Sequence, residues 1–196
     1  MEGRGIARYG HAISCERIKV TEAAHPVADD MGEVGVQQRL DLLHTLKSDD
    51  QVICLLSGGG SPLMALPTDG VSVEDKTSIN TQLLASGATI HEMNCVRRHL
   101  SKIKGGGLLR YCGNAKVSTY LVSDVTGDDP SVIASGPTLP DNTTCKDALE
   151  VINRLKIQVS DKIRQKLLIG ELETLKCGNP IFDRTSEPVN QPSSML

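Results

Sequence analysis

Aromatic residues are scarce in this sequence. They make up 2% of its 196 residues, with no tryptophan and one phenylalanine. Aliphatic side chains must therefore build the core, and few rings are available to stack on the bases of single-stranded nucleic acid. The formal net charge of −3 provides no basic field that would attract a polyanion. We therefore expect no nucleic-acid partner, and any anion-binding site must be local.

Long apolar runs and organised cysteines are lacking as well. No run approaches the length of a membrane span, and residues 1–11 lack the apolar core of a signal peptide. The six cysteines are scattered, without a CxxC pair or a Cys/His spacing typical of a metal site. These absences predict a cytoplasmic protein with reduced, structural thiols and no membrane partner.

The remaining composition is that of an ordinary globular protein. Hydrophobic residues make up 39% and charged residues 23%. Residues 17–23 read as a strand, Asp29 or Asp30 can cap a following helix, and residues 51–56 read as a second strand. This alternation predicts an α/β fold with a mainly parallel sheet.

The central stretch is QVICLLSGGGS, residues 51–61. Its apolar run is typical of a strand buried on both faces of a parallel sheet. The glycines that follow can let backbone N–H groups converge on an anion at the carboxyl end of the strand. The spacing matches neither a Walker A loop nor a GxGxxG turn, so a tight structural connection is the alternative.

A helix is predicted from Thr89 to Lys104. Thr89 and Glu92 form a capping box, and three glycines end the helix. Polar residues line one flank of its apolar stripe: Asn94, Arg97, Ser101 and Lys104. Two cations at this edge can reach into a cleft, although a solvated shoulder of long side chains explains the pattern equally well.

A second polar cluster follows the strand predicted over residues 116–124. Asp124, Asp128 and Asp129 lie in a loop rich in glycine and proline, and oxygen ligands of this kind suit Mg²⁺ or a substrate hydroxyl. An Asp-rich turn without a ligand is the alternative. Ser135 and Gly136 offer a second place where the backbone can approach an anion.

Three long motifs together resemble one family. LLSGGGSPLMALP, LLASGATIHEMNCVRRHLSKIKGG and LVSDVTGDDPSVIASGPTLPD, in this order, are similar to the N-terminal domain of the type-2 glycerate kinases, whose members often carry a C-terminal MOFRL domain. The resemblance covers residues 10–184. It implies a Rossmann-like, three-layer α/β/α domain and the transfer of a phosphoryl group from ATP to the 2-hydroxyl of D-glycerate, with Mg²⁺.

Residue types and positions suggest the roles within such a site, since phosphoryl transfer needs positioning and charge neutralisation. The predicted catalytic residues are Lys104, Arg97 and Asp124, and the predicted metal ligands are Asp128 and Asp129. The predicted cofactor-binding residues are Ser57, Gly58, Gly59, Gly60, Ser61, Asn94, Ser135 and Gly136.

The family pattern is only partly matched. Its first βα segment with a Gly-Lys-Ala motif and its second domain have no counterpart in residues 1–196. We therefore expect an incomplete domain over residues 1–184, a disordered tail over residues 185–196, and a chain that is marginally stable or self-associates into homo-oligomers through an exposed sheet edge.

Two other functions belong to different classes. Members of the family also carry the name hydroxypyruvate reductase, but a nicotinamide site would call for a GxGxxG turn, and SGGGS does not provide one. A module that binds ligand without catalysis is the third hypothesis.

Overall fold

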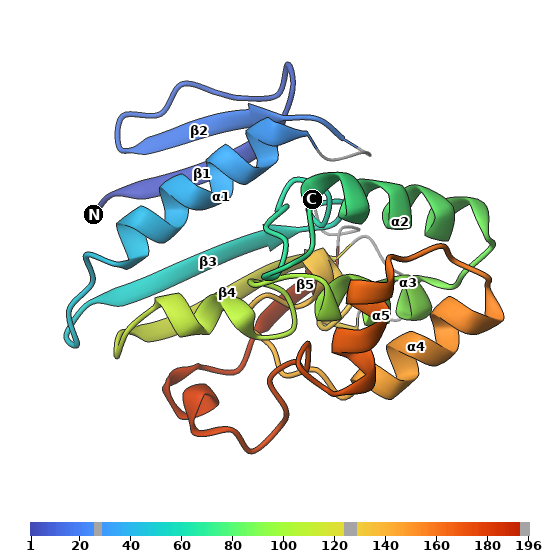
Figure 1. Ribbon diagram of the computed structural model, residues 1–196. Coiled ribbons are helices and arrows are strands. Elements are labelled where there is room, and N and C mark those ends of the chain that lie inside the picture. Colours follow the sequence, from blue (N-terminus) through green and yellow to red (C-terminus); the bar gives the residue numbers. More distant parts are fainter. Residues whose placement is uncertain (26–28, 124–128, 193–196) are drawn as a thin grey trace.

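The computed structural model describes residues 1–25, 29–123 and 129–192. Figure 1 shows strands and helices interspersed along the chain, with the helices following the strands singly or in pairs. The elements are β1 (Gly3–Arg8), β2 (Ile18–Ala23), α1 (Asp30–Leu43), β3 (Gln51–Ser57), α2 (Val73–Ala85), α3 (Ile90–His99), β4 (Lys116–Ser123), α4 (Cys145–Arg154), α5 (Asp161–Leu168) and β5 (Val189–Pro192). None of the described helices is long and apolar enough for a membrane crossing.

All strand pairs are parallel. β1 pairs with β2, and β4 lies between β3 and β5 in a three-stranded sheet. Helix α1 connects the two sheets, because its buried Val36 and Leu40 belong to one apolar cluster with Ile6 of β1 and Leu56 of β3. The predicted α/β class with a parallel sheet and an incomplete domain is confirmed.

Local capping signals set the helix starts as predicted. Asp29 accepts a hydrogen bond from the Gly32 amide at 3.2 Å and caps α1. Ser72 with Asp75 and Thr89 with Glu92 form complete capping boxes at α2 and α3. Each box satisfies two backbone groups that a helix end leaves unpaired, so a short sequence pattern is sufficient here.

The predicted end of α3 is wrong. The helix stops at His99 rather than at Lys104, because the chain turns to pair with the segment around Pro67. The Lys102 amide donates to the Leu66 carbonyl at 3.0 Å, and the Thr68 amide donates to the Leu100 carbonyl at 3.3 Å. A tertiary contact thus overrides the local helical pattern, and Arg97 and Lys104 do not share one helix.

The central strand is not buried on both faces, contrary to the prediction. Ile53 is 54% exposed and Leu55 is 71% exposed, while the alternate residues of β3 are partly covered. Leu55 pairs in register with Tyr120, and Tyr120 pairs with Val189, so apolar residues line one open face of the three-stranded sheet. An apolar run alone does not reveal whether both faces are covered.

The expectation of a disordered tail is wrong for residues 189–192, which form β5. The strand pairs with the edge of β4, and just before it the Ser186 amide donates to the Val117 carbonyl at 3.0 Å. The edge of β4 offers backbone groups that a passing segment can pair with regardless of its side chains. A Pro/Ser/Asn-rich composition therefore does not prevent strand formation here.

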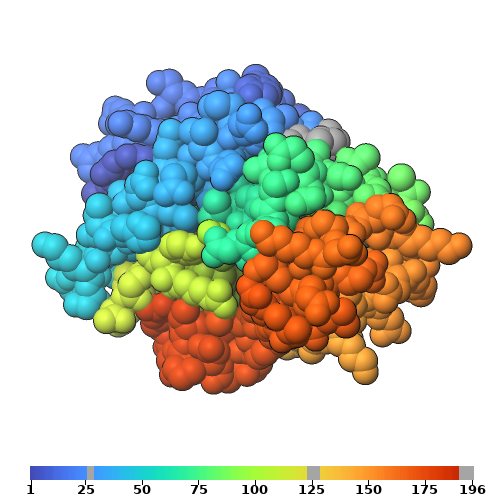
Figure 2. All heavy atoms as spheres, in the orientation of Figure 1, coloured from blue at the N-terminus to red at the C-terminus, as the bar shows by residue number. Residues whose placement is uncertain are grey.

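The largest core cluster belongs to the helices. Leu83 of α2, Val96 of α3, Ile152 of α4 and Ile163 of α5 are fully buried together. In the space-filling view the orange atoms of α4 and α5 lie beside the green atoms of the α2 region at one end of the molecule (Figure 2). Helices α2 and α3, which carry the candidate site, therefore rest on a well-packed base.

Candidate functional site

Lys104 joins the glycine loop to the segment after β4. Its Nζ donates hydrogen bonds to the Ser61 carbonyl at 2.9 Å, to Ser61 Oγ at 2.9 Å and to the Ala134 carbonyl at 3.4 Å. The residue is 3% exposed. Three motifs that are far apart in the sequence therefore meet at one buried amine.

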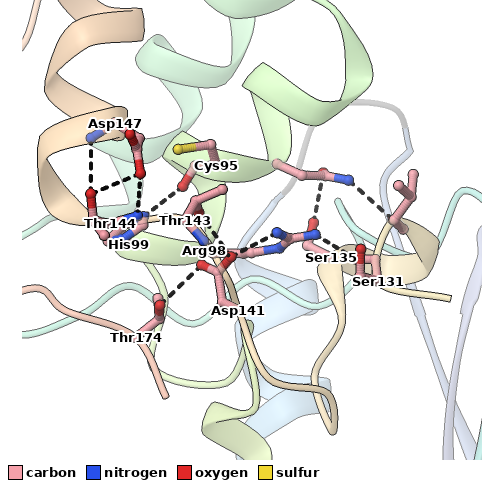
Figure 3. A network of polar contacts seen from close by, with 12 residues as sticks. Cys95, Arg98, His99, Ser131, Ser135, Asp141, Thr143, Thr144, Asp147 and Thr174 are labelled. Carbon is pink, nitrogen blue, oxygen red and sulfur yellow. Dashed lines mark hydrogen bonds and ion pairs between the residues drawn. The ribbon is translucent and has the colours of Figure 1, made fainter. Parts of the chain in front are cut away.

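A chain of side-chain hydrogen bonds continues from Ser61. Ser135 Oγ lies 2.8 Å from Ser61 Oγ and donates to Asn94 Oδ1 at 2.9 Å, while Asn94 Nδ2 donates to the Val132 carbonyl at 3.1 Å. Because the Ser135 hydroxyl donates its proton to Asn94, the Ser61 hydroxyl donates to Ser135 Oγ and accepts a hydrogen bond from Lys104 Nζ. Figure 3 shows Ser135 and its bond to the helix above it.

The turn at residues 134–136 holds an unusual backbone conformation. Ala134, Ser135 and Gly136 have φ values of 51°, 63° and 61°, and left-handed geometry is costly for the two residues that carry a Cβ. The Gly105 amide donates to the Ser135 carbonyl at 3.1 Å, and the Gly106 amide donates to the Gly136 carbonyl at 2.9 Å. The backbone after α3 thus fixes the turn that presents Ser135.

The glycine loop is partly committed to the fold. The Gly58 amide donates to the Val122 carbonyl at 3.1 Å, and the Gly60 amide donates to the Ser57 carbonyl at 3.4 Å. Gly59 has φ of +70°, and a Cβ added to it would lie 3.3 Å from Nε2 of His25. Among the described residues the Gly59 and Ser61 amides have no acceptor, so fewer amides are available to an anion than the sequence suggests.

A pocket lies between α2 and α3. Its polar lining comes from six residues: Ser61, Lys76, Thr77, Asn80, Arg97 and Lys104. We call this pocket the cation pocket. Arg97 Nε donates to Asn80 Oδ1 at 2.7 Å. Lys76 and Asn80 were not singled out from the sequence, although their i, i+4 spacing places them on one face of α2.

Burial acts on the charges of the cation pocket. It lowers the pKa of Lys104 well below its usual value, and the charges of Lys76, Arg97 and Arg98 act in the same direction. Burial likewise lowers the pKa of Lys76 to about 8, with a further contribution from Arg97. The pKa of Arg97 is lowered by burial too. Burial and mutual repulsion thus disfavour the charged forms of these side chains.

Arg98 belongs to a separate set of contacts on the other side of α3. It donates to Asp141 Oδ1 at 2.9 Å and to the Ser131 carbonyl at 2.6 Å. Asp141 also accepts from Thr143 and Thr174 (Figure 3). We call these five residues the Asp141 network. Burial alone would raise the pKa of Asp141, but the Thr143 amide and the Arg98 charge lower it below its usual value.

Three side chains that could act as metal ligands lie close together near this network. His99 Nε2, Cys145 Sγ and a carboxylate oxygen of Glu173 lie within 4.8 Å of one another. However, His99 Nδ1 contacts the Cys95 carbonyl at 2.8 Å, His99 Nε2 lies 3.2 Å from Glu173, and Lys176 pairs with Glu173. Protein contacts therefore account for the placement of His99 and Glu173.

The predicted carboxylates are placed only in part. Asp124 and Asp128 lie outside the described residues. Asp129 accepts a hydrogen bond from the Ser131 amide at 2.9 Å, at the start of the segment that leads to Ser135. The structure therefore brings together Ser61, Asn94, Lys104 and Ser135, with Arg97 lining the same pocket, whereas the metal ligands stay a prediction.

Comparisons with known proteins agree with this arrangement of motifs. The family described as "Domain of unknown function (DUF4147)" matches residues 1–168. The crystal structure of a glycerate kinase from Thermotoga maritima superposes with a TM-score of 0.81 at 38% identity, covering 97% of this chain and 44% of that one.

Sequence relatives carry two kinds of name. The glycerate 2-kinase of Pyrococcus horikoshii is 41% identical over 89% of this chain and 41% of its own length. A protein of Agrobacterium vitis, provisionally named hydroxypyruvate reductase, is 48% identical over 91% of this chain and 40% of its own length. The chain thus spans about two fifths of the length of these relatives. It belongs to the DUF4147 family, and its resemblance to the type-2 glycerate kinases is confirmed.

Proposed function

We propose that this chain serves the ATP-dependent phosphorylation of D-glycerate to 2-phosphoglycerate. Lys104 and Arg97 provide the positive charge, and Ser61, Asn94 and Ser135 position the reacting groups. The proposal draws on the names of the relatives at 41% identity and on the contacts around Lys104. Phosphoryl transfer is catalysed mainly by positioning and electrostatic stabilisation, which is what such an arrangement can supply.

One observation carries the proposal. Lys104 Nζ bonds to Ser61 and to the Ala134 carbonyl, which ties the glycine loop after β3 to the strained turn after β4. Parallel sheets place ligands at the carboxyl ends of their strands, and both segments follow such ends. The left-handed geometry of Ala134 and Ser135 supports the proposal, because strained backbone conformations cluster at functional sites.

The metal proposed for this site is Mg²⁺, held by the carboxylates that follow β4. Asp128 and Asp129 are the proposed ligands, and Asp124 is proposed to lie near the metal or the substrate hydroxyl; carboxylates are the ligands that Mg²⁺ prefers in proteins. When bound, the ion would neutralise phosphate charge. The chain's own cations, Lys104 and Arg97, would add to that neutralisation from the opposite segment.

A coupled assay tests the function. The chain is incubated with D-glycerate, ATP and Mg²⁺, and 2-phosphoglycerate is measured, while a parallel reaction follows NAD(P)H oxidation with hydroxypyruvate. ATP-dependent product supports the proposal, and Lys104→Ala should then lower turnover by orders of magnitude. Lys146→Ala on the exposed surface of α4 is the matched control and should be neutral.

Two outcomes contradict the kinase assignment. NAD(P)H consumption without ATP-dependent product favours the reductase. Binding of ATP or glycerate without turnover would assign the chain a ligand-binding role only.

A further inference from the structure

The cation pocket has an unbalanced charge. Lys76, Arg97 and Lys104 all line it, and none of its described lining residues is an aspartate or a glutamate. Apolar side chains such as Ile79, Leu83 and Leu100 form much of the remaining wall. Cations in such surroundings lose hydration without gaining a counter-charge, which is unfavourable unless a partner is supplied.

The three cations differ in how well they are satisfied. Lys104 donates to three protein oxygens. Arg97 uses Nε toward Asn80. Lys76 Nζ is shielded from solvent and has no hydrogen-bond partner among the described residues. Lys104 is therefore held by the protein itself, whereas Lys76 is the amine with all its donors free.

Among the residues that the structure describes, no other group explains the position of Lys76. Glu33 of α1 is the carboxylate whose charge favours protonation of Lys76, but the two residues form no hydrogen bond. Burial and Arg97 act in the opposite direction and keep the pKa of Lys76 near 8. An ammonium group that served only stability would be expected to reach Glu33 or the solvent.

We infer that Lys76 and the terminal nitrogens of Arg97 bind an oxyanion, a carboxylate or a phosphate, in the pocket between α2 and α3. The identity of this oxyanion rests on the proposed function, because D-glycerate provides a carboxylate and ATP provides phosphates. Lys104 also holds Ser61 beside the bound group.

The test compares Lys76→Met with Lys146→Met. Methionine keeps the length and helical propensity of lysine but removes the amine. Binding of inorganic phosphate, D-glycerate and glycerol to each purified chain is measured by calorimetry at pH 7. We expect Lys76→Met to weaken binding of one oxyanion by about 10- to 100-fold, as for the loss of a hydrogen bond to a charged group. Lys146→Met should bind as the unaltered chain does.

Comparison of the three tested compounds identifies the ligand. A loss confined to phosphate indicates the nucleotide or a phosphorylated group, and a loss confined to D-glycerate indicates the substrate carboxylate. Glycerol, which lacks the carboxylate, should bind weakly to all three chains. Unchanged affinities in Lys76→Met, or no binding of either oxyanion to the unaltered chain, would overturn the inference.

Stability provides a second measurement that a structural role would not reproduce. Without ligand, Lys76→Met should unfold at a higher temperature than the unaltered chain, because an unpartnered ammonium is removed from an apolar wall. A lower unfolding temperature would overturn the inference. As a second variant, Lys76→Arg keeps the charge and must bind the same oxyanion within a few-fold.

The outcome is separable from the kinase proposal. ATP-dependent turnover with unchanged oxyanion binding in Lys76→Met would contradict this inference alone. Lost oxyanion binding in Lys76→Met, with no turnover by the unaltered chain, would contradict the kinase proposal alone.

Discussion

Helix α3 presents two neighbouring arginines to two different surroundings. Arg98 enters the Asp141 network, where an aspartate with no exposed surface compensates its charge. Arg97 enters the cation pocket, which has no described acidic lining residue. The difference separates two uses of buried charge: a compensated charge stabilises the fold, and an uncompensated one is available to a ligand.

The largest effect is expected on the compensated side. Arg98→Met leaves Asp141 buried without its cation and should lower the free energy of unfolding by about 3 to 5 kcal/mol. Urea denaturation followed by circular dichroism measures the change. A loss below about 1 kcal/mol would mean that the Asp141 network does not depend on charge compensation.

A smaller loss is expected for Lys104, the satisfied member of the cation pocket. Lys104→Met removes the donor that serves Ser61 and Ala134, and leaving these oxygens unpaired should cost about 1 to 3 kcal/mol. Lys76→Met should change stability in the opposite direction. If both variants lose the same amount in the same denaturation experiment, the two lysines are equivalent and the distinction between them is wrong.

A titration sharpens the contrast without any substitution. The folded-state pKa of Lys76, about 8, lies below its usual 10.5, so the unfolded chain binds more protons between these pH values. The contribution of Lys76 to stability should therefore rise from about pH 8 to 10.5 and stay constant below that window. Oxyanion affinity should fall over the same range.

The control for this titration is Lys76→Met, measured at each pH. Arg97, Lys104 and Glu33 also carry charge near Lys76 and remain in both proteins. The difference between the two stability curves therefore reports Lys76 together with its charge coupling to Lys104. A constant difference across this range would show that Lys76 titrates normally.

The smallest effect is expected at the surface. Lys102 pairs with Asp69 at 2.7 Å, and the Asp69 side chain is 88% exposed. Lys102→Met should change the free energy of unfolding by less than about 1 kcal/mol, because exposed ion pairs are weak. A larger loss would indicate that burial does not distinguish the charges around α3.

Local sequence signals explain much of the fold. Capping residues fixed the starts of α1, α2 and α3, because a cap depends on residues only three positions apart. The end of α3 depends on pairing with residues 66–68, a contact that no local pattern records. The open face of β3 and the pairing of β5 depend on neighbours that are distant in the sequence.

The meeting of Ser61, Lys104 and Ser135 could be anticipated for a related reason. Each of them stands next to a glycine, which marks a turn in the sequence. Lys76 lies within α2, where a lysine usually extends into solvent. Only the packing of α2 on α3 turns it into a shielded, unpartnered amine. Similarly, the Arg98–Asp141 pair joins residues 43 positions apart and has no local signature.

The left-handed turn at Ala134 and Ser135 couples the site to the folding of the chain around it. Ala134 and Ser135 are held in a strained backbone conformation. The hydrogen bonds from the Gly105 and Gly106 amides maintain it. Loss of these two hydrogen bonds would let the turn relax, and Ser135 would move away from Ser61. The contact between Ser61 and Ser135 and the local backbone conformation therefore persist or are lost together.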